Sequence, residues 1–350
     1  MTSRYDIERE ALGELLTGEP SFRVRQIWDG LYGQAAPLES LTSLPKTLRA
    51  RLDDDLPLAL DPVAESTSHD GQTVKWLWAL SGGARIETVL MLYPDRATVC
   101  ISTQAGCAMA CGFCATGQGG FERHLEPGEI VEQVVRAIWK ARELGRRVSN
   151  IVFMGMGEPL ANYDRVWTSV QRLHDDIGIS ARHLTVSTVG IVPGIRRLAT
   201  EALPVNLAVS LHAANDSLRD ELVPINRRYP LAVLEEACRD YLAAKNRRLS
   251  FEWALIDGVN DRDTDAVELA AITRRLRAHV NLIPLNPTPG WPTRGTPPAG
   301  VRAFRDRLVG LGVNVTVRRN RGTDIDAACG QLAARHGGAA PVTLRGRAST

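Results

Sequence analysis

Two kinds of apolar pattern occupy the amino-terminal part of the chain. In residues 21–32, apolar side chains recur at helical intervals with arginines between them, and this pattern predicts amphipathic helices within 1–60. Residues 56–70 contain prolines and small residues, a composition that predicts a linker. The apolar runs 73–80 and 84–92 are separated by Ser-Gly-Gly, which predicts a β-hairpin.

From residue 97 onward, short apolar runs alternate with longer amphipathic segments. We predict strands at 97–103, 150–156, 183–189, 205–212, 250–256, 280–285 and 313–318. We predict helices at 127–143, 163–175, 193–202, 231–246, 263–278 and 300–311. This alternation favours a parallel sheet covered by helices. Six or seven units are too few for an eightfold barrel, so a partial α/β barrel fits best, with its chemistry on the loops that follow the strands.

The composition is that of an ordinary globular protein, with 350 residues, 44% hydrophobic, 23% charged and a net charge of +2. The near-neutral net charge predicts that any contact with nucleic acid is made through a local basic patch. No uncharged apolar run is long enough to span a membrane, and the charged opening residues are unlike a secretory signal. We therefore expect a cytoplasmic protein, in which clustered cysteines indicate metal binding or catalysis more often than structural disulfides.

Three of the six cysteines, Cys107, Cys111 and Cys114, lie within eight positions with the spacing C-x3-C-x2-C. Cysteine thiolates bind zinc or iron–sulfur clusters. A structural zinc site needs a fourth ligand, which His124 could supply. A [4Fe–4S] cluster held by three cysteines would instead leave one iron open to a small molecule. The loop follows the first predicted barrel strand, where chemistry is expected, and this position favours the cluster.

Small polar residues follow several of the predicted strands. The second strand ends in Gly155-Met156-Gly157-Glu158-Pro159, where glycine allows close backbone approach and Glu158 could bind an ammonium group. Later strand ends carry Ser187, Ser210, Leu211, His212 and Asn286. A single residue of this kind would usually cap a helix or a turn, and the glutamate alone would be a solvated turn residue. Their repetition on successive strands predicts a shared ligand site.

Taken together, these stretches resemble the RlmN/Cfr family of radical S-adenosylmethionine (SAM) adenosine methyltransferases. The resemblance extends from about residue 87 to residue 332 and is weaker for the amino-terminal helices. It implies a partial (β/α)6-type radical SAM barrel with a small helical accessory domain. The implied divisions are an accessory domain that contacts RNA (1–60), a linker and β-hairpin (61–92), the radical SAM core (93–324) and a carboxy-terminal segment with a basic tail (325–350).

The resemblance also implies roles for individual residues. Cys107, Cys111 and Cys114 would hold one [4Fe–4S] cluster, whose open iron binds SAM. The SAM site would comprise Gly157, Glu158, Ser187, Ser210, Leu211, His212 and Asn286. Cys329 would be the cysteine that is methylated, Cys100 its resolving partner and Glu87 the acid/base group.

The residues alone leave simpler interpretations of these last positions open. From the residues alone, Cys100 and Cys329 are better explained as buried, inert cysteines, which is the commonest state of a lone cysteine. Glu87 could be a charge on the exposed face of a strand. Cys238 has no motif around it, and we predict that it belongs to the core.

The implied reaction is methylation of carbon 2 of adenosine, in the peptidyl-transferase centre of 23S ribosomal RNA and just 3′ of the anticodon in transfer RNA. Cys329 would take a methyl group from one SAM, and cleavage of a second SAM would generate the radical that joins this carbon to the adenine. Attack by Cys100 on Cys329 would then release the product and leave a disulfide. A reductant, expected to be a flavodoxin-like donor, must restore the thiols. No membrane partner is expected, and a monomer is the default.

Several alternatives remain open. The Cfr branch methylates carbon 8 of the ribosomal adenosine with the same cluster and cysteine pair. A radical SAM enzyme could act on another substrate, or the chain could be a non-catalytic zinc-containing RNA-binding protein. For the RNA contact itself, the favoured candidates are the arginine pairs 227–228 and 318–319, which lie near the predicted mouth of the barrel.

Overall fold

The computed structural model describes residues 3–286, 288, 292, 294–319, 321–327 and 331–332. A ten-stranded sheet dominates these residues, in the order β1-β2-β3-β4-β7-β8-β9-β10-β11-β12. From β4 onward, neighbouring strands of this sheet run parallel. The parallel strands are β4 (Ala97–Cys100), β7 (Val148–Phe153), β8 (Leu184–Thr188), β9 (Asn206–Ser210), β10 (Leu249–Leu255), β11 (His279–Pro284) and β12 (Asn314–Val317). Each coincides with a predicted strand.

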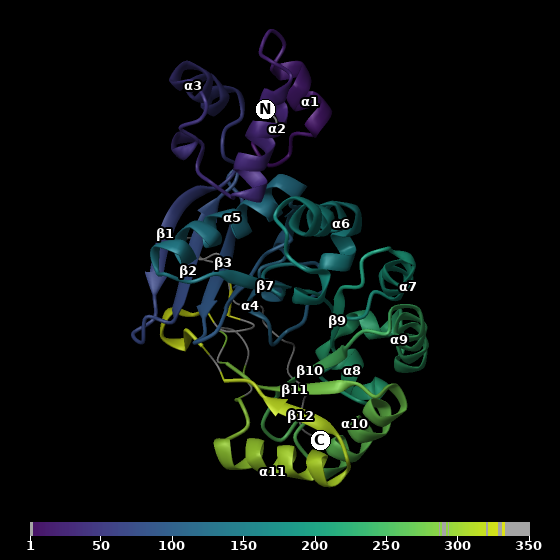
Figure 1. The fold of residues 1–350 in the computed structure, drawn as a ribbon. Helices are drawn as coiled ribbons and strands as arrows, with labels where there is room; N and C mark the ends of the chain where they lie inside the picture. Colours follow the sequence, from purple (N-terminus) through teal and green to yellow (C-terminus); the bar gives the residue numbers. More distant parts are fainter. Residues whose placement is uncertain are drawn as a thin grey trace.

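The helices between these strands cover the outer face of the curved sheet (Figure 1). They are α5 (Pro127–Glu143), α6 (Tyr163–Gln171), α7 (Val192–Thr200), α9 (Leu231–Lys245), α10 (Asp263–Leu276) and α11 (Pro298–Gly310). In the described part of the chain, β1 and β12 are the two ends of the sheet and form no ladder with each other. The partial barrel predicted from the alternation of strands and helices is therefore confirmed. None of the helices described is long and apolar enough to cross a membrane.

The segment 56–70 is not a linker, and this part of the sequence prediction was wrong. It contains β1 (Asp61–Thr67), which pairs antiparallel with β2 (Thr73–Ala79). The predicted hairpin is present, because β2 pairs in turn with β3 (Arg85–Leu92). β3 pairs antiparallel with β4, so the hairpin extends the barrel sheet. β1 is an exposed edge strand, and its polar sequence carries no apolar alternation that could reveal it.

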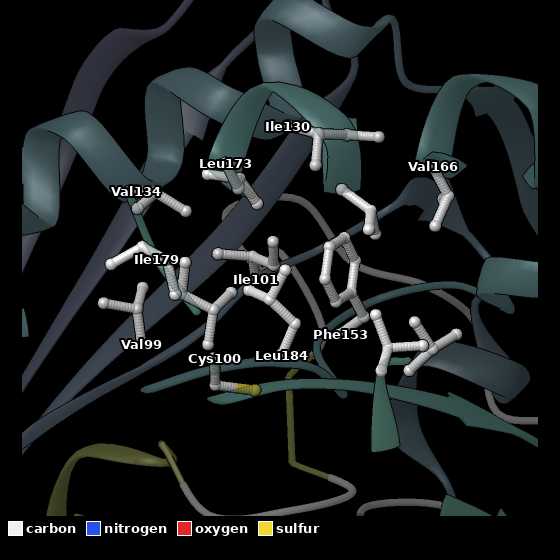
Figure 2. Close-up of a cluster of buried hydrophobic side chains, with 14 of the residues drawn as sticks. Val99, Cys100, Ile101, Ile130, Val134, Phe153, Val166, Leu173, Ile179 and Leu184 are labelled. Atoms are coloured by element: carbon white, nitrogen blue, oxygen red, sulfur yellow. The ribbon is translucent and has the colours of Figure 1, made fainter. Parts of the chain in front are cut away.

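Apolar side chains fill the space between the sheet and its helices. Figure 2 shows Val99 and Ile101 of the first parallel strand packed with Phe153 against side chains of α5 and α6. Successive side chains of a strand point to opposite faces. Cys100, between Val99 and Ile101, therefore projects to the inner face of the barrel, and in Figure 2 its sulfur lies below the other labelled side chains. The sequence pattern thus places a thiol inside the barrel.

The amino-terminal residues form a small helical unit on one flank of the barrel, at the top of Figure 1. Its helices are α1 (Arg9–Leu15), α2 (Phe22–Trp28) and α3 (Lys46–Asp55). Trp28 donates its indole N–H to Asp176 beyond α6 at 2.8 Å. Arg172 donates to the carbonyl of Tyr5 and forms an ion pair with Glu8 at 2.5 Å. These contacts bind the unit to the outer helices.

Candidate active site

The three clustered cysteines lie on a loop that is enclosed by a hairpin not predicted from the sequence. β5 (Gln104–Gly106) pairs antiparallel with β6 (Phe121–His124), and the loop between them also contains α4 (Ala115–Gln118). Gly106 has φ 71°, and a β-carbon there would lie 2.0 Å from the carbonyl oxygen of Gly120. Only glycine fits such a position. Cys107 donates its N–H to the same carbonyl at 2.6 Å, so the start of the loop is fixed against the hairpin.

The clustered thiols are partly or fully buried: Cys111 is buried, and Cys107 and Cys114 are partly exposed. Cys111 packs with Phe113 in a small apolar cluster beside the main core. Burial, with smaller contributions from the charges of Glu158 and Cys114, raises the pKa of Cys107 to about 12. The pKa of Cys111 is raised by burial first and then by the charges of Cys114 and Cys107. The three thiols therefore lie close enough to interact, and the surroundings of Cys107 and Cys111 disfavour their thiolates unless a metal balances the charge.

This donor set fits an iron–sulfur cluster better than a zinc ion. Among the residues that the structure describes, no three His, Cys, Asp or Glu side chains lie close enough together to hold one metal ion. A zinc site would bring each thiolate to about 2.3 Å from a single ion. His124, the fourth ligand in the zinc interpretation, has its Nδ1 3.1 Å from the side-chain nitrogen of Gln104. The geometry therefore does not support the zinc alternative, whereas a cluster can take the three cysteines at separate irons.

Glu158 follows β7 and is buried beside the cysteine loop. Its Oε1 accepts the N–H of Leu160 at 3.0 Å, and its Oε2 accepts the N–H of Val189 at 2.8 Å. Its own N–H donates to Oε1 of Gln104 at 2.8 Å. Burial raises the pKa of this carboxyl to about 7, although the two backbone hydrogen bonds oppose the rise. A carboxyl held rigidly in this way would gain stability from a cationic ligand, as expected of a group that binds an ammonium.

The backbone of the loop after β7 comes so close to Gln104 of β5 that one of its positions requires glycine. Gly157 has φ 100°, and a β-carbon there would lie 2.6 Å from the side chain of Gln104. Gln104 therefore contacts Gly157, Glu158 and His124. The sequence patterns did not identify it, because a buried glutamine at a strand end gives no motif by itself.

His212 follows β9 and lies on the other side of the cysteine loop. Its ring is in edge contact with Phe113, with 4.7 Å between the ring centroids. Its Nδ1 accepts the N–H of Ala254 at 3.0 Å. Burial, together with the charge of Arg219, lowers the pKa of His212 to about 3. The imidazole is therefore neutral, and because Nδ1 accepts, its proton lies on Nε2, where it can be donated to a ligand.

The remaining residues of the expected SAM site lie at the same end of the sheet. Ser187 of β8 donates its hydroxyl to the carbonyl of Phe153 at 2.6 Å. Ser210 ends β9, and Asn286 follows β11 and is buried. Leu211 is buried, its N–H donates to the backbone carbonyl of Glu252 and its carbonyl accepts the N–H of Ala213. These hydrogen bonds hold the strand end in place between Ser210 and His212.

A buried arginine that the sequence patterns missed supports these strand ends. Arg219, on the unpredicted helix α8 (Asp216–Leu222), is fully buried. It donates to the carbonyl of Val189 at 2.6 Å and to the carbonyl of Leu211 at 3.1 Å. It also donates to Oδ1 of Asn226 at 2.8 Å. Burial lowers its pKa to about 10, which leaves it charged near neutral pH. It therefore joins the loops after β8 and β9.

Glu87 and Cys100 lie on one face of neighbouring strands. Lys75 of β2 is paired with Val89 of β3, and Val89 is paired with Cys100 of β4. Glu87 is two residues from Val89 and shares its face. It is 5% exposed, and its Oε1 lies 3.3 Å from Nζ of Lys75. The interpretation of Glu87 as an exposed surface charge is therefore wrong.

The carboxy-terminal segment crosses this part of the sheet. Lys75 donates from Nζ to the carbonyl of Asp326 at 3.3 Å. Arg321 donates to the carbonyl of Leu92 at 3.1 Å, and Asp324 accepts the N–H of His69 at 2.8 Å. Figure 1 shows this yellow segment beside the β1–β2 end of the sheet. Cys329 lies outside the described residues, whereas Cys238 is buried in the main core, as predicted.

The two arginine pairs favoured for RNA contact have different environments. Arg227 and Arg228 are exposed after α8, on the side of the barrel where the strands end. Arg318 instead forms an ion pair with Glu252 of β10 at 3.0 Å. This contact joins the end of β12 to β10, while the side chain of Arg318 stays partly exposed, so the role of pair 318–319 in RNA contact stays a prediction.

Comparisons with known proteins agree with this geometry. The family model of the radical SAM superfamily matches residues 101–270. The chain is 51% identical to the probable dual-specificity RNA methyltransferase RlmN of Chloroflexus aurantiacus, over 95% of this chain and 93% of that protein. It is 49% identical to the protein of the same name from Thermobifida fusca, over 93% and 92% of the two chains. A crystal structure of a radical SAM methyltransferase from Sphaerobacter thermophilus superposes with a TM-score of 0.91 and 52% identity, covering 96% of this chain and 100% of that one.

Proposed function

The chain belongs to the RlmN family of radical SAM RNA methyltransferases, and we propose that it methylates carbon 2 of adenosine in both 23S ribosomal RNA and transfer RNA. The targets would be an adenosine of the peptidyl-transferase centre and the adenosine just 3′ of the anticodon. The name shared by its relatives, dual-specificity RNA methyltransferase, supports two classes of RNA substrate. We further propose that the protein acts as a monomer and that it takes electrons from a flavodoxin-like protein.

The observation that carries the proposal is the placement of Cys100. It lies on the inner face of β4, and the chain continues from it through β5 to the cysteine loop. It shares its face with Glu87 and Lys75, and Lys75 contacts the segment that leads toward Cys329. A non-cluster thiol, a buried carboxylate and the carboxy-terminal segment thus meet on one part of the sheet, as a reaction through a cysteine-bound methyl group requires.

The residues at the strand ends would hold the cofactors. Cys107, Cys111 and Cys114 would bind the [4Fe–4S] cluster, and Glu158 would orient the ammonium group of SAM. The neutral ring of His212 offers a donor at Nε2, and Ser187, Ser210 and Asn286 would complete the polar wall. When bound, the cluster and SAM supply a methyl group from one SAM and a 5′-deoxyadenosyl radical from another.

The chain's own groups then guide the methyl carbon. Cys329, as thiolate, accepts the methyl group, and its carbon is activated by loss of a hydrogen atom to the 5′-deoxyadenosyl radical and bonds to carbon 2 of adenine. The adduct then loses one electron, which would return to the iron–sulfur cluster, and Glu87 accepts the proton that leaves the ring. Cys100 attacks the sulfur of Cys329, a disulfide forms, the sulfur–carbon bond breaks, and the released carbon takes a proton to become the methyl group. Two electrons from the reductant restore both thiols.

The test is the identity of the methylated nucleoside. RNA incubated with the reconstituted protein, SAM and a reductant is digested and analysed by mass spectrometry against authentic standards. We expect 2-methyladenosine from both ribosomal and transfer RNA. Formation of 8-methyladenosine would assign the chain to the carbon 8 reaction and overturn the proposal.

Two variants test the covalent route separately. Cys329→Ala should abolish methyl transfer, whereas Cys100→Ala should leave Cys329 able to accept a methyl group and should trap RNA on the protein. Cys238→Ala, which removes a buried thiol of the main core, is the matched control and should retain methylation. Methyl transfer that survives the Cys329→Ala change would disprove the covalent route.

A further inference from the structure

A cavity of about 270 Å³ lies between the helical amino-terminal unit and the barrel. It is located where α5 ends and β7 begins, at Val148. This is the end of the strands opposite to the cysteine loop and Glu158. Three arginines line it, at positions 142, 146 and 147. The other lining residues are glycine, alanine, valine and isoleucine.

The backbone around this cavity is fixed by the end of α5. Gly145, with φ 65°, terminates the helix, and the N–H of Arg146 donates to the carbonyl of Ala141 at 2.7 Å. The carbonyl of Arg147 accepts the N–H of Ala97, at the start of β4, at 3.2 Å. Arg142 donates from its guanidinium to the carbonyl of Ala35 at 2.9 Å. Two protein layers therefore meet here. They fix the backbone of Arg146 and Arg147 and the guanidinium of Arg142, while all three residues stay exposed.

The charge of these arginines is not balanced locally. Within the described ranges, none of Arg142, Arg146 and Arg147 forms an ion pair, although other arginines on the same flank do. Arg136 pairs with Glu132 at 3.1 Å and Arg172 with Glu8 at 2.5 Å. Acidic side chains close in sequence to the lining have other partners: Glu143 lies 3.7 Å from Lys140, Asp175 lies 4.0 Å from His174, and Asp176 accepts from Trp28. A cavity with three unpaired guanidinium groups and no acidic side chain in its lining favours an anion.

The lining also indicates what kind of anion fits. It contains no aromatic ring on which a base could stack and no side-chain hydrogen-bond acceptor. Such a surface can bind phosphate but cannot distinguish one base from another. We propose that the cavity binds a backbone phosphate of the RNA substrate, at a point remote from the methylated adenosine. The inference rests on the proposed function, because it takes RNA as the substrate.

The position of the cavity determines which RNA can reach it. β7 has six residues, and at about 3.3 Å per residue it separates the cavity from the strand-end site by about 20 Å. A short loop that carries only the target adenosine would end before this distance. A folded RNA whose helix continues along the flank of the protein would reach it. The arginines therefore select for RNA size and shape and play no part in the chemistry.

The experiment compares two RNAs with one variant. The Arg142→Ala/Arg146→Ala/Arg147→Ala variant is titrated with a full-length transfer RNA transcript and with a hairpin that holds only the target loop and two base pairs. We expect the dissociation constant for the transcript to rise roughly 10- to 100-fold at low salt, and the slope of log affinity against log salt to fall by about 2–3. Hairpin affinity and the turnover rate at saturating transcript should not change.

The control removes the same charge from the far side of the molecule. Arg302, Arg305 and Arg307 lie on α11, which Figure 1 places at the opposite end from α1–α3, and their change to alanine should leave transcript affinity within about twofold. Because Arg142 also contacts Ala35, the Arg146→Ala/Arg147→Ala variant repeats the test with that contact intact. Transcript affinity equal to wild type, or an equal loss for hairpin and transcript, would overturn the inference. Wild-type protein that binds neither RNA would instead overturn the proposed function.

Discussion

Replacement of Glu158 by Gln should change how stability depends on pH in the cluster-free protein. The ordinary pKa of a glutamate side chain is 4.5, and burial raises the pKa of Glu158 to about 7. Between these two values the unfolded chain has lost its proton while the folded protein keeps it. Glu158 therefore lowers the free energy of unfolding progressively as pH rises from 4.5 to about 7. Above that range this destabilisation is complete.

The magnitude follows from the same two values. At about 1.4 kcal/mol per pH unit, the difference between 4.5 and about 7 corresponds to about 3 kcal/mol. The neutral amide that replaces the carboxyl cannot ionise, so this dependence disappears in the variant. Loss of one of the two backbone hydrogen bonds, from Leu160 or Val189, adds a destabilisation of about 1–3 kcal/mol that does not depend on pH.

Urea unfolding of both proteins at pH 5, 6, 7 and 8 measures the effect. The free energy of unfolding of the variant, minus that of the wild type, should rise by about 2.5 kcal/mol from pH 5 to pH 8. Glu122→Gln, at an exposed position of β6, serves as the control and should show no comparable rise. A difference that stays constant within about 1 kcal/mol across the range would refute the burial argument. SAM should also bind more tightly to wild-type protein above pH 7, where the carboxylate needed for its ammonium group is present.

Three further substitutions test separate parts of the site. Lys75→Met should reduce RNA methylation roughly 10-fold or more, while mass analysis still finds methylated Cys329, because Lys75 positions Glu87 for a later step; loss of the methyl on Cys329 would contradict this order. Arg219→Met should lower the free energy of unfolding by about 3–5 kcal/mol, because its buried partners lose their donor. The exposed ion pair of Arg197 provides the comparison, and its removal should lower the free energy of unfolding by less than about 1 kcal/mol. Gly106→Ala should lower the iron bound per chain below half, because its β-carbon would collide with the hairpin; Gly119→Ala, with no contact closer than 3.6 Å, should bind iron normally.

Most of the parallel strands were predictable because they are buried and therefore read as continuous apolar runs. β12 is the exception, because it has exposed positions. The elements that were missed are short or partly exposed. β1 is an edge strand with a polar sequence, and β5 and β6 have three and four residues. Strands of this length are held by pairing with a neighbour, which a local pattern cannot show. The hairpin around the cysteine loop was therefore visible only once the chain was folded.

The site was partly predictable for a similar reason. A cysteine spacing and a glycine-rich strand end are local signals, so the cluster loop and Glu158 could be identified from the residues themselves. Burial of a charge is not a local signal. Arg219 and Glu87 both look like surface charges in the sequence, yet both are buried, because their partners come from other elements. For Glu87 only the family resemblance indicated a role.

The contacts of Lys75 connect two parts of the proposed cycle. Its ammonium group lies 3.3 Å from Glu87 and also 3.3 Å from the carbonyl of Asp326, so one side chain holds both the buried carboxylate and the carboxy-terminal segment. Any movement that takes this segment off the sheet, for example to expose a disulfide to its reductant, must break the second contact. The ammonium group then loses one of the two groups that fix its position, and Glu87 loses part of its restraint. Docking of the segment and the position of the Glu87 carboxylate are therefore coupled. Glu87 is held in place when the segment that leads to Cys329 is also in place.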